Sequence, residues 1–292
     1  MDVLNGIDWN GVWMDAQQKN IDSGGGGECW TAWADKEAAK NYLNSFIASP
    51  STKKRVAELS RMVKFESRVL DIGAGPGAIA IPLSKKVSHV TAVEPAPGMI
   101  EVFRDRLALA GAENIRLIPK RWEDVAVDPD LEAPYDLCFA AFSLGMLDLK
   151  QSIEKMIRVS TNNIVLYWHV GLQSFDEDAV ALSPLLYGKK HYPVPESSII
   201  FNLLYGMRIY PDVKIERKNV RLVYKTFNEI FEIYARRYSA ETNDQQEMLA
   251  SYLRAKFIPF EGKSVIRFTH RISMRLSWQT HIITTKKILA AE

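Results

Sequence analysis

The sequence predicts an α/β fold built on a parallel, doubly wound sheet. Short apolar runs that suit buried strands alternate along the chain with longer segments that suit helices. The run from 136 to 141 is apolar after its first residue, as expected for a strand covered on both faces. A glycine-rich loop follows the first of these strands, which is where sheets of this kind bind ligands.

The core of the fold is expected within residues 51–170. Its strands are expected at 69–72, 89–93, 115–118, 136–141 and 163–168, and its helices at about 51–62, 76–86, 98–110 and 148–159. Ser51 or Thr52 can cap the first of these helices, and Gly111 stands where a helix end favours glycine.

Residues 1–50 are interpreted as an N-terminal helical segment. Trp9 and Trp13 precede a run of glycines at 24–27, and Trp30 and Trp33 follow it. Glycine runs permit movement, so one interpretation is a lid whose tryptophans close over a ligand. The alternative is that the tryptophans pack on the domain surface and the glycines form only a loop.

Residues 171–292 are interpreted as substrate-side helices, an insertion and the final strands of the same sheet. The expected elements are a helix at 195–209, a strand at 214–224, helices at 227–238 and 244–257, and one long strand or a hairpin at 264–283. This order predicts a helical insertion, from about Thr226 to Gly262, between the last two strands.

Composition excludes several classes of protein. The formal charge is +2, from 37 basic and 35 acidic residues, which gives little field for holding nucleic acid. The chain has two cysteines, which argues against a disulfide scaffold and fits a reducing cytoplasm. No signal peptide or membrane-spanning apolar run is visible, so a membrane partner is not expected.

The glycine loop carries the main chemical signal. Asp71 ends the first strand, the glycines follow as Gly73-x-Gly75-x-Gly77, and Glu94 ends the second strand. Glycines let the backbone approach a ligand, and a carboxylate at the second strand can accept both ribose hydroxyls. Such loops serve a nicotinamide dinucleotide or S-adenosylmethionine.

Two features favour S-adenosylmethionine over the dinucleotide. A carboxylate at Asp71 repels a pyrophosphate but can take the ammonium group of a methionine moiety. The glycine spacing also differs from the G-x-G-x-x-G of dinucleotide folds. A nicotinamide-dependent oxidoreductase therefore remains only as a less favoured alternative.

The stretch from Val69 to Gly77 resembles the first motif of class I S-adenosylmethionine-dependent methyltransferases of the small-molecule branch, similar to the type 11 and type 12 groups. The segment from Ala92 to Ile100 resembles their second motif. The resemblance implies a Rossmann-like, seven-stranded, mostly parallel sheet with helices on both faces and an antiparallel last strand. The helical insertion before that strand also resembles this group, and the expected fold adds the N-terminal helical lid suggested by the tryptophans and the glycine run.

The resemblance further assigns roles to individual residues. Asp71 and the three glycines would hold the methionine end of S-adenosyl-L-methionine, and Glu94 its ribose. Pro95, Met99, Trp122 and Glu123 would surround the adenine, and Ala140 belongs to the fourth motif. The family often has an acid where this chain has Arg121, so contact with the adenine amino group would pass to Glu123 or Asp124. Trp122 would stack on the adenine or pack as an ordinary core aromatic.

The end of the fourth strand bears on the acceptor. Ala140-Ala141-Phe142-Ser143 lacks the Asn/Asp-Pro-Pro-Tyr/Phe tetrapeptide of enzymes that methylate DNA bases, and no set of acids suits a metal-dependent catechol type. We therefore expect a small-molecule acceptor, no nucleic acid and no metal. A non-catalytic module that binds S-adenosylmethionine is the alternative, because methyl transfer needs no universal catalytic side chain.

Substrate-side residues are suggested only by position. His169 follows the fifth strand, where it would act as a base, a substrate contact or a structural histidine. Trp30 and Trp33 would lie on the substrate side as part of the lid. His191 and Tyr192 would line a substrate mouth, although loop residues of this kind are usually just exposed. Arg237 would bind an anion or form part of a solvated helix face. The acceptor atom and the oligomeric state stay open.

Overall fold

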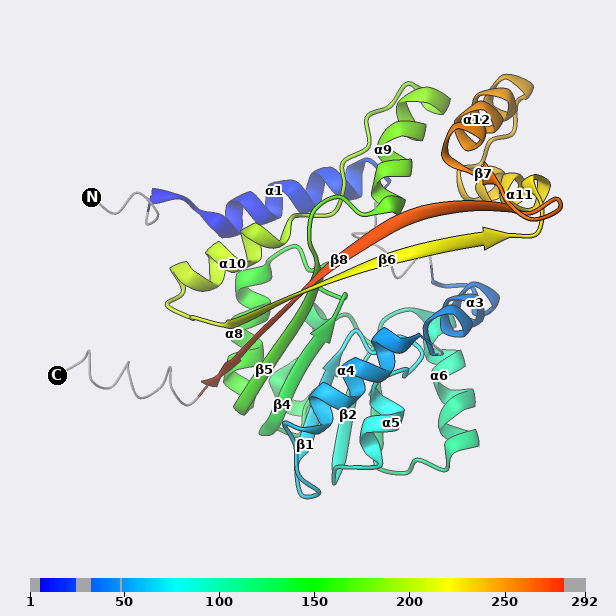
Figure 1. Ribbon diagram of the computed structural model, residues 1–292. Helices are drawn as coiled ribbons and strands as arrows, with labels where there is room; N and C mark the ends of the chain where they lie inside the picture. Colours follow the sequence, from blue (N-terminus) through cyan, green and yellow to red (C-terminus); the bar gives the residue numbers. More distant parts are fainter. Residues whose placement is uncertain (1–5, 25–32, 48, 281–292) are drawn as a thin grey trace.

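The computed structural model describes residues 6–24, 33–47 and 49–280. Its strands are β1 (Arg68–Ile72), β2 (His89–Val93), β3 (Ile115–Ile118), β4 (Tyr135–Ala141), β5 (Ser160–His169), β6 (Asp212–Tyr224), β7 (Ile258–Pro259) and β8 (Val265–Gln279). They form one sheet in the order β3-β2-β1-β4-β5-β8-β6, with the short β7 paired to β8 (Figure 1).

The helices are α1 (Trp9–Asp22), α3 (Lys36–Ile47), α4 (Pro50–Ser60), α5 (Ala80–Ser84), α6 (Pro97–Ala110), α7 (Val127–Asp130), α8 (Leu149–Val159), α9 (Ser174–Tyr187), α10 (Ser197–Gly206), α11 (Phe227–Arg237) and α12 (Asn243–Lys256). Within the described ranges, none of them is long and apolar enough to cross a bilayer.

The predicted fold class is confirmed, with one difference in the number of strands. Strands β1 to β5 are parallel, and β8 runs antiparallel to both of its neighbours, β5 and β6. The two-residue β7 makes the sheet eight-stranded rather than seven-stranded. The insertion between the last two long strands consists of α11 and α12, as expected.

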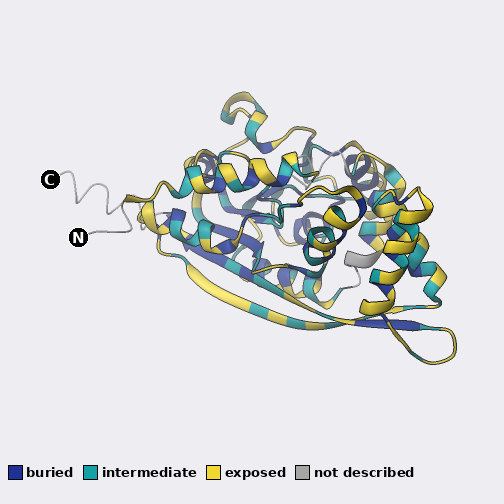
Figure 2. Ribbon diagram, turned by 90° about the horizontal axis from the view of Figure 1, so that it is seen from above, coloured by how far each residue is buried: buried dark blue, intermediate teal, exposed yellow. Residues whose placement is uncertain are grey.

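Two apolar clusters cover the two faces of the sheet. Alternate residues of β1 point to opposite faces, so Val69 joins the cluster with α4, α5 and α6, whereas Leu70 joins the cluster with α1, α8 and α10. The central strands are accordingly buried, while β6 is exposed or half-exposed along its length (Figure 2). This is the layered arrangement in which ligands bind at the carboxyl ends of the parallel strands.

Three expectations about helices differ from the structure. The helix expected at 76–86 is only α5, because the chain still follows loop geometry through Gly77, whose φ is +73°. Helix α9 was not anticipated, since its apolar residues show little helical periodicity. Trp13 is fully buried in the core, so α1 packs against the domain.

Candidate cofactor and acceptor site

The glycine loop turns immediately beyond β1. Gly73, Gly75 and Gly77 have φ values of +72°, +55° and +73°, a region that favours glycine. A Cβ at Gly73 would lie 2.2 Å from the Cβ of Ser143, and one at Gly77 would lie 2.4 Å from the ring of Phe103. A Cβ at Gly75 would meet nothing within 4 Å. Packing inside the protein therefore requires the outer two glycines, whereas the middle one borders open space.

Two buried carboxylates belong to the strand ends beside this loop. Asp71 is 2% exposed, and its Oδ2 makes no hydrogen bond within the described structure. The two oxygens of Glu94 accept the backbone N–H groups of Gly75, at 2.7 Å, and Ala96, at 2.8 Å. Burial raises the pKa of Asp71 well above its usual range, and the nearby charge of Glu94 raises it further. Burial also raises the pKa of Glu94, although its two backbone hydrogen bonds oppose the increase.

These residues fit S-adenosylmethionine in charge and in space. Two buried carboxyl groups with raised pKa values suit a ligand that brings a positive charge and hydroxyl donors. The unpartnered oxygen of Asp71 provides an acceptor, and the free space at Gly75 leaves the backbone open to close approach. The same two carboxylates would repel a pyrophosphate.

The 3-10 turn at Trp122–Asp124 follows β3 on the adenine side of the expected site. The indole of Trp122 is 3% exposed and packs in the core, where its Nε1 donates to the carbonyl oxygen of Ser152 at 3.2 Å. This placement supports the core alternative and does not support stacking on adenine. Arg121 donates two hydrogen bonds to the carboxylate of Asp124. The half-buried Glu123 is therefore the acid of this turn that is better placed to bind the adenine amino group.

Lys155 of α8 supports this turn and was not anticipated from the sequence. Its Nζ donates to the carbonyl oxygens of Trp122 at 2.7 Å, Glu123 at 3.1 Å and Val125 at 2.8 Å. Burial lowers the pKa of Lys155, and nearby acids partly offset that effect. A lysine in an amphipathic helix normally signals a solvated face, so nothing in the local sequence distinguishes this one.

Three other expected cofactor residues lie after β2, in β4 and in α6. Pro95 is half-buried directly after Glu94, and Ala140 is fully buried in β4 beside Ile72. Met99 is 3% exposed and packs with α3. A Cβ on neighbouring Gly98 would lie 2.5 Å from the carbonyl oxygen of Asp35, so the start of α6 touches the segment leading into α3.

The end of β4 bends sharply beside the glycine loop. Phe142 has a φ of +61°, which is uncommon for a bulky residue, and its N–H donates to Tyr167 at 3.0 Å. Ser143 follows, and its hydroxyl donates to the carbonyl oxygen of Ile72. The bend therefore brings the end of β4 against β1 at the loop.

His169 lies at the end of β5 and packs against two aromatic rings. The centroid of its imidazole is 4.7 Å from that of the Phe142 ring and 5.5 Å from that of the Phe175 ring. Burial lowers the pKa of His169 to about 4, and the positive charges of Arg271 and Arg55 lower it further. The histidine is thus neutral near pH 7.

Helix α1 is attached to the loop after β4. The Nε1 of Trp13 donates to the carbonyl oxygen of Met146 at 2.8 Å, and Gln17 donates to that of Gly145 at 3.2 Å. Trp33 packs on Tyr42, with ring centroids 4.9 Å apart. These contacts agree with the packing alternative for the tryptophans. Trp30 and the glycines at 25–27 lie outside the described residues.

His191 and Tyr192, expected at a substrate mouth, lie against the end of α1. His191 is buried rather than exposed, and burial lowers its pKa. The backbone of Tyr192 is held by Asn20 and Ser23, at the end of α1. Arg237 is exposed at the end of α11, which supports the solvated-face alternative.

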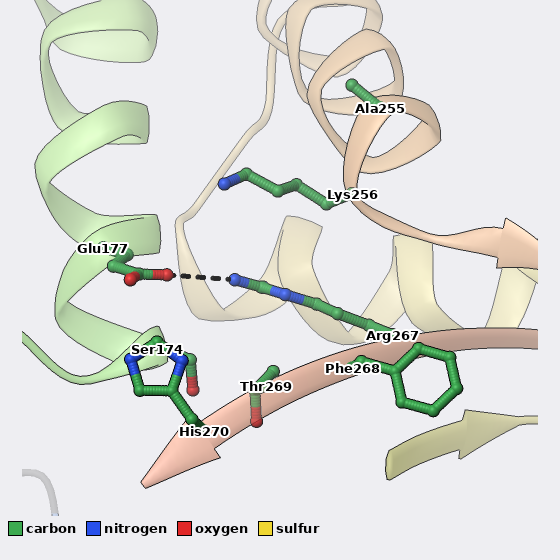
Figure 3. Close-up of a pocket in the computed structure, with 8 residues that line it drawn as sticks. All are labelled: Ser174, Glu177, Ala255, Lys256, Arg267, Phe268, Thr269 and His270. Carbon is green, nitrogen blue, oxygen red and sulfur yellow. Dashed lines mark ion pairs between the residues drawn. The ribbon is translucent and has the colours of Figure 1, made fainter. Parts of the chain in front are cut away.

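A cavity of about 260 Å³ lies between the start of α9, the end of α12 and β8. Figure 3 shows the guanidinium of Arg267 pointing toward Glu177, from which it is separated by 3.6 Å; Ser174 and His270 also line the cavity. Arg267 also binds buried Asp178 at 2.7 Å. No group of His, Cys, Asp or Glu in the described part of the chain is arranged to hold a metal.

One family model matches the core of the chain. Residues 69–163 match the family model described as a methyltransferase domain. A Haemophilus influenzae protein described only as uncharacterized is 29% identical over 132 residues, covering 45% of this chain and 48% of the relative. A Magnetococcus marinus ribosomal RNA small subunit methyltransferase A is 37% identical over 73 residues, covering 25% and 26%.

Aklanonic acid methyltransferase DauC of a Streptomyces species is 41% identical over 68 residues, covering 22% of this chain and 30% of that protein. The chain spans less than half the length of each of these curated relatives. Among solved structures, a Bacillus halodurans protein described as a putative methyltransferase aligns with a TM-score of 0.53 at 14% identity. That alignment covers 78% of this chain and 97% of the other and shows a shared fold.

Proposed function

We propose that the chain methylates a small-molecule acceptor. The premise is that it belongs, through residues 69–163, to the class I S-adenosylmethionine-dependent methyltransferase family. One observation carries the proposal. Buried Asp71 has an unpartnered oxygen and lies close enough to Glu94 to feel its charge, and Glu94 accepts the N–H of Gly75, a glycine whose missing side chain borders open space. That combination suits a cationic ligand with a ribose and disfavours a dinucleotide.

The residues of the site have separable tasks. S-adenosylmethionine, when bound, supplies an electrophilic methyl group. Asp71 would accept hydrogen bonds from its ammonium group, directly or through water, and Glu94 would accept from the ribose with the lone pairs that Gly75 and Ala96 leave free. Pro95 and Glu123 would contact the adenine. Orientation of the acceptor against the methyl group would contribute much of the rate.

His169 is better suited to orient an acceptor than to deprotonate one. A base works best when its pKa lies near the working pH, and the pKa of His169 is lowered to about 4. We therefore propose that His169 contacts the acceptor in its neutral form and that any acidic acceptor loses its proton before it binds.

A small molecule is the proposed acceptor for two reasons. The near-balanced charge of +2 offers little attraction to a polyanion. The fourth strand ends in Ala140-Ala141-Phe142-Ser143 and lacks the prolines of base-methylating enzymes. The matched relatives include one named for ribosomal RNA and one named for aklanonic acid, so they support either acceptor class. We also propose a reducing compartment such as the cytoplasm, because the chain has two cysteines.

Calorimetric titration of the full chain with S-adenosylhomocysteine and with NAD tests the cofactor. We expect saturable binding of the first ligand only, and its loss in Asp71→Asn. Asp136→Asn is the matched control, because Asp136 accepts the N–H of Arg68 at the opposite end of the sheet. Binding of NAD instead would contradict the proposal.

Methyl transfer is tested by S-adenosylhomocysteine release in a metabolite extract, with ribosomal RNA as a second acceptor. Product from the metabolite fraction supports the small-molecule proposal. Product only from RNA would contradict that acceptor class. Cofactor binding with no product from either source would favour a non-catalytic binding module.

A further inference from the structure

We propose that the acceptor carries a primary or secondary ammonium group, whose N–H hydrogens are accepted by Asp176 of α9 and Asn20 of α1. This inference rests on the proposed function, because it names the class of acceptor for the same site. It is carried by two buried oxygen atoms, one on each of these side chains, that have no hydrogen-bond partner within the described ranges. We call Asn20, Asp176 and the segment 191–194 that they contact the amine site.

Asp176 shares an uncommon property with the aspartate of the cofactor loop. Among the buried carboxylates of residues 6–24, 33–47 and 49–280, only Asp71 and Asp176 have a buried oxygen without a partner. The others, Glu58, Glu94 and Asp178, accept hydrogen bonds from a lysine, backbone N–H groups and an arginine, respectively. Asp71 is assigned to the ammonium group of the cofactor, and Asp176 offers the same chemistry to a second ligand.

The place of Asp176 in the first turn of α9 does not by itself explain its burial. Acids favour the start of a helix because they interact with its dipole, and they normally stay solvated there. Glu177 follows this rule, with a side chain that is 35% exposed, whereas Asp178 is buried and bonded to Arg267 through both of its oxygens. Asp176 is only 4% exposed and has no such cation. An ammonium ligand would supply the missing partner.

The described surroundings of Asp176 supply no positive charge. Burial raises the pKa of Asp176 to about 6, the nearby backbone N–H of Val194 opposes the increase, and no described cation contributes. Lys190 is exposed, with its Nζ 4.5 Å from the centre of the Tyr192 ring. Burial lowers the pKa of His191, so that imidazole is mainly neutral at pH 7. Asp176 is therefore mainly ionised at pH 7, and a ligand that brings a positive charge complements it.

Asn20 brings a second acceptor to the same segment. It is 1% exposed, and its Nδ2 donates to the carbonyl oxygen of Tyr192 at 2.5 Å, whereas its Oδ1 has no partner. The N–H of Val194, which lies near Asp176, is two residues further along, and two residues of chain span at most about 7 Å. Asn20 and Asp176 thus contact one short stretch of backbone, and an ammonium group with two N–H hydrogens can meet both.

Helix α1 connects the amine site with the cofactor loop. Gln17 lies one turn before Asn20 on the same face of the helix, and its amide donates to the carbonyl oxygen of Gly145 at 3.2 Å. Gly145 comes two residues after Ser143, whose hydroxyl donates to the carbonyl oxygen of Ile72 at the end of β1. Asn20 is thus one helical turn from a contact with the loop that follows β4.

Helix α9 places Asp176 at the same edge of the sheet. The helix begins shortly after β5 ends, and the ring of Phe175 lies 5.5 Å from that of His169, measured between centroids (Figure 1). This is the edge at which ligands of such sheets bind. A protonated amine has no lone pair with which to attack a methyl group. The amine held by Asp176 therefore anchors the acceptor, and another atom of the acceptor is methylated.

The first test sorts acceptors by charge and uses the unmodified chain. A small-metabolite extract is passed over a cation-exchange resin at acidic pH, which retains amines, and S-adenosylhomocysteine release is measured with the retained and unretained fractions. We expect release with the retained fraction. We also expect its loss after acetylation with acetic anhydride, followed by hydroxylamine to restore hydroxyl groups, because acetylation removes the charge of primary and secondary amines. Release with the unretained fraction alone, or release that survives acetylation, would overturn the inference.

Asp176→Asn then assigns the recognition to one side chain. Asparagine keeps the shape of the side chain and removes its charge. We expect the variant to bind S-adenosylhomocysteine as before but to need roughly tenfold or more of the retained fraction for a half-maximal rate. The matched control is Glu177→Gln, because Glu177 is the neighbouring acid and faces the cavity beside Arg267. An unchanged requirement in Asp176→Asn, or an equal increase in Glu177→Gln, would contradict the assignment.

The two proposals fail in different ways. If neither fraction yields S-adenosylhomocysteine, the proposed function fails and this inference fails with it. If only the unretained fraction yields it, the chain transfers methyl groups and the inference about the amine is overturned alone. If Asp176→Asn does not fold, which thermal unfolding shows, the sorting by charge with the unmodified chain is the deciding measurement.

Discussion

Replacement of Gly75 by alanine separates the needs of the fold from those of the ligand. All three loop glycines have positive φ, so alanine at any of them introduces strain of about 1–2 kcal/mol. At Gly75 the added methyl group meets no protein atom within 4 Å. We therefore expect Gly75→Ala to fold and to melt only about 2–4 °C lower for each kcal/mol of strain.

The ligand affinity of Gly75→Ala should fall much further than its stability. The methyl group would occupy the space proposed for the cofactor, and overpacking of this kind costs about 1–3 kcal/mol. That range corresponds to a loss of about 5- to 150-fold in affinity for S-adenosylhomocysteine. Isothermal titration calorimetry measures the affinity, and differential scanning calorimetry measures the stability.

Gly77→Ala is the contrasting variant. Its Cβ would lie 2.4 Å from the ring of Phe103, which is fully buried and has no room to move. We expect a loss of about 2–5 kcal/mol in stability from strain and overpacking together. The reasoning would be refuted if Gly75→Ala bound S-adenosylhomocysteine as well as the unmodified chain, or if Gly77→Ala were the more stable of the two variants.

Three further predictions concern the site and its support. Asp71→Asn is expected to stabilise the ligand-free protein at pH 7, because it removes a buried acid with a raised pKa. Because the pKa of Asp71 is raised in the folded protein, its carboxyl group lowers the stability of the fold as the pH rises above the ordinary pKa of an aspartate. The stability gained by Asp71→Asn should therefore vanish near pH 4, as measured by denaturant titrations. Lys155→Met leaves three carbonyl oxygens of the turn after β3 without their donor, so urea unfolding should show a loss of about 1–3 kcal/mol, with weaker S-adenosylhomocysteine binding. Trp13→Ala should cost about 3–5 kcal/mol in the same assay, because the indole is fully buried.

Each of these predictions has an outcome that contradicts it. A stability difference between Asp71→Asn and the unmodified chain that does not change from pH 4 to pH 7 would show that the carboxyl group is not the cause. Unchanged stability of Lys155→Met would show that water replaces the ammonium group. Unchanged stability of Trp13→Ala would favour a mobile lid over a packed helix.

The sequence by itself determined the order of the strands and helices of the core and the cofactor loop. Both depend on local properties: apolar runs of strand length, glycines at positions of positive φ, and an acid at each of two neighbouring strand ends. Because parallel strands end at one edge of a sheet, local sequence was enough to expect Asp71 and Glu94 close together.

Only the tertiary structure decided what surrounds that loop. The position of Trp122 after a strand makes it a candidate ligand contact. The indole instead packs in the core, because α8 covers it. Arg55 lies far from Phe142 in the sequence, and only the packing of α4 over the sheet places its guanidinium against that ring. Residues that meet through packing of distant segments leave no spacing pattern along the chain, so the acceptor side could not be read from the sequence, whereas the cofactor side could.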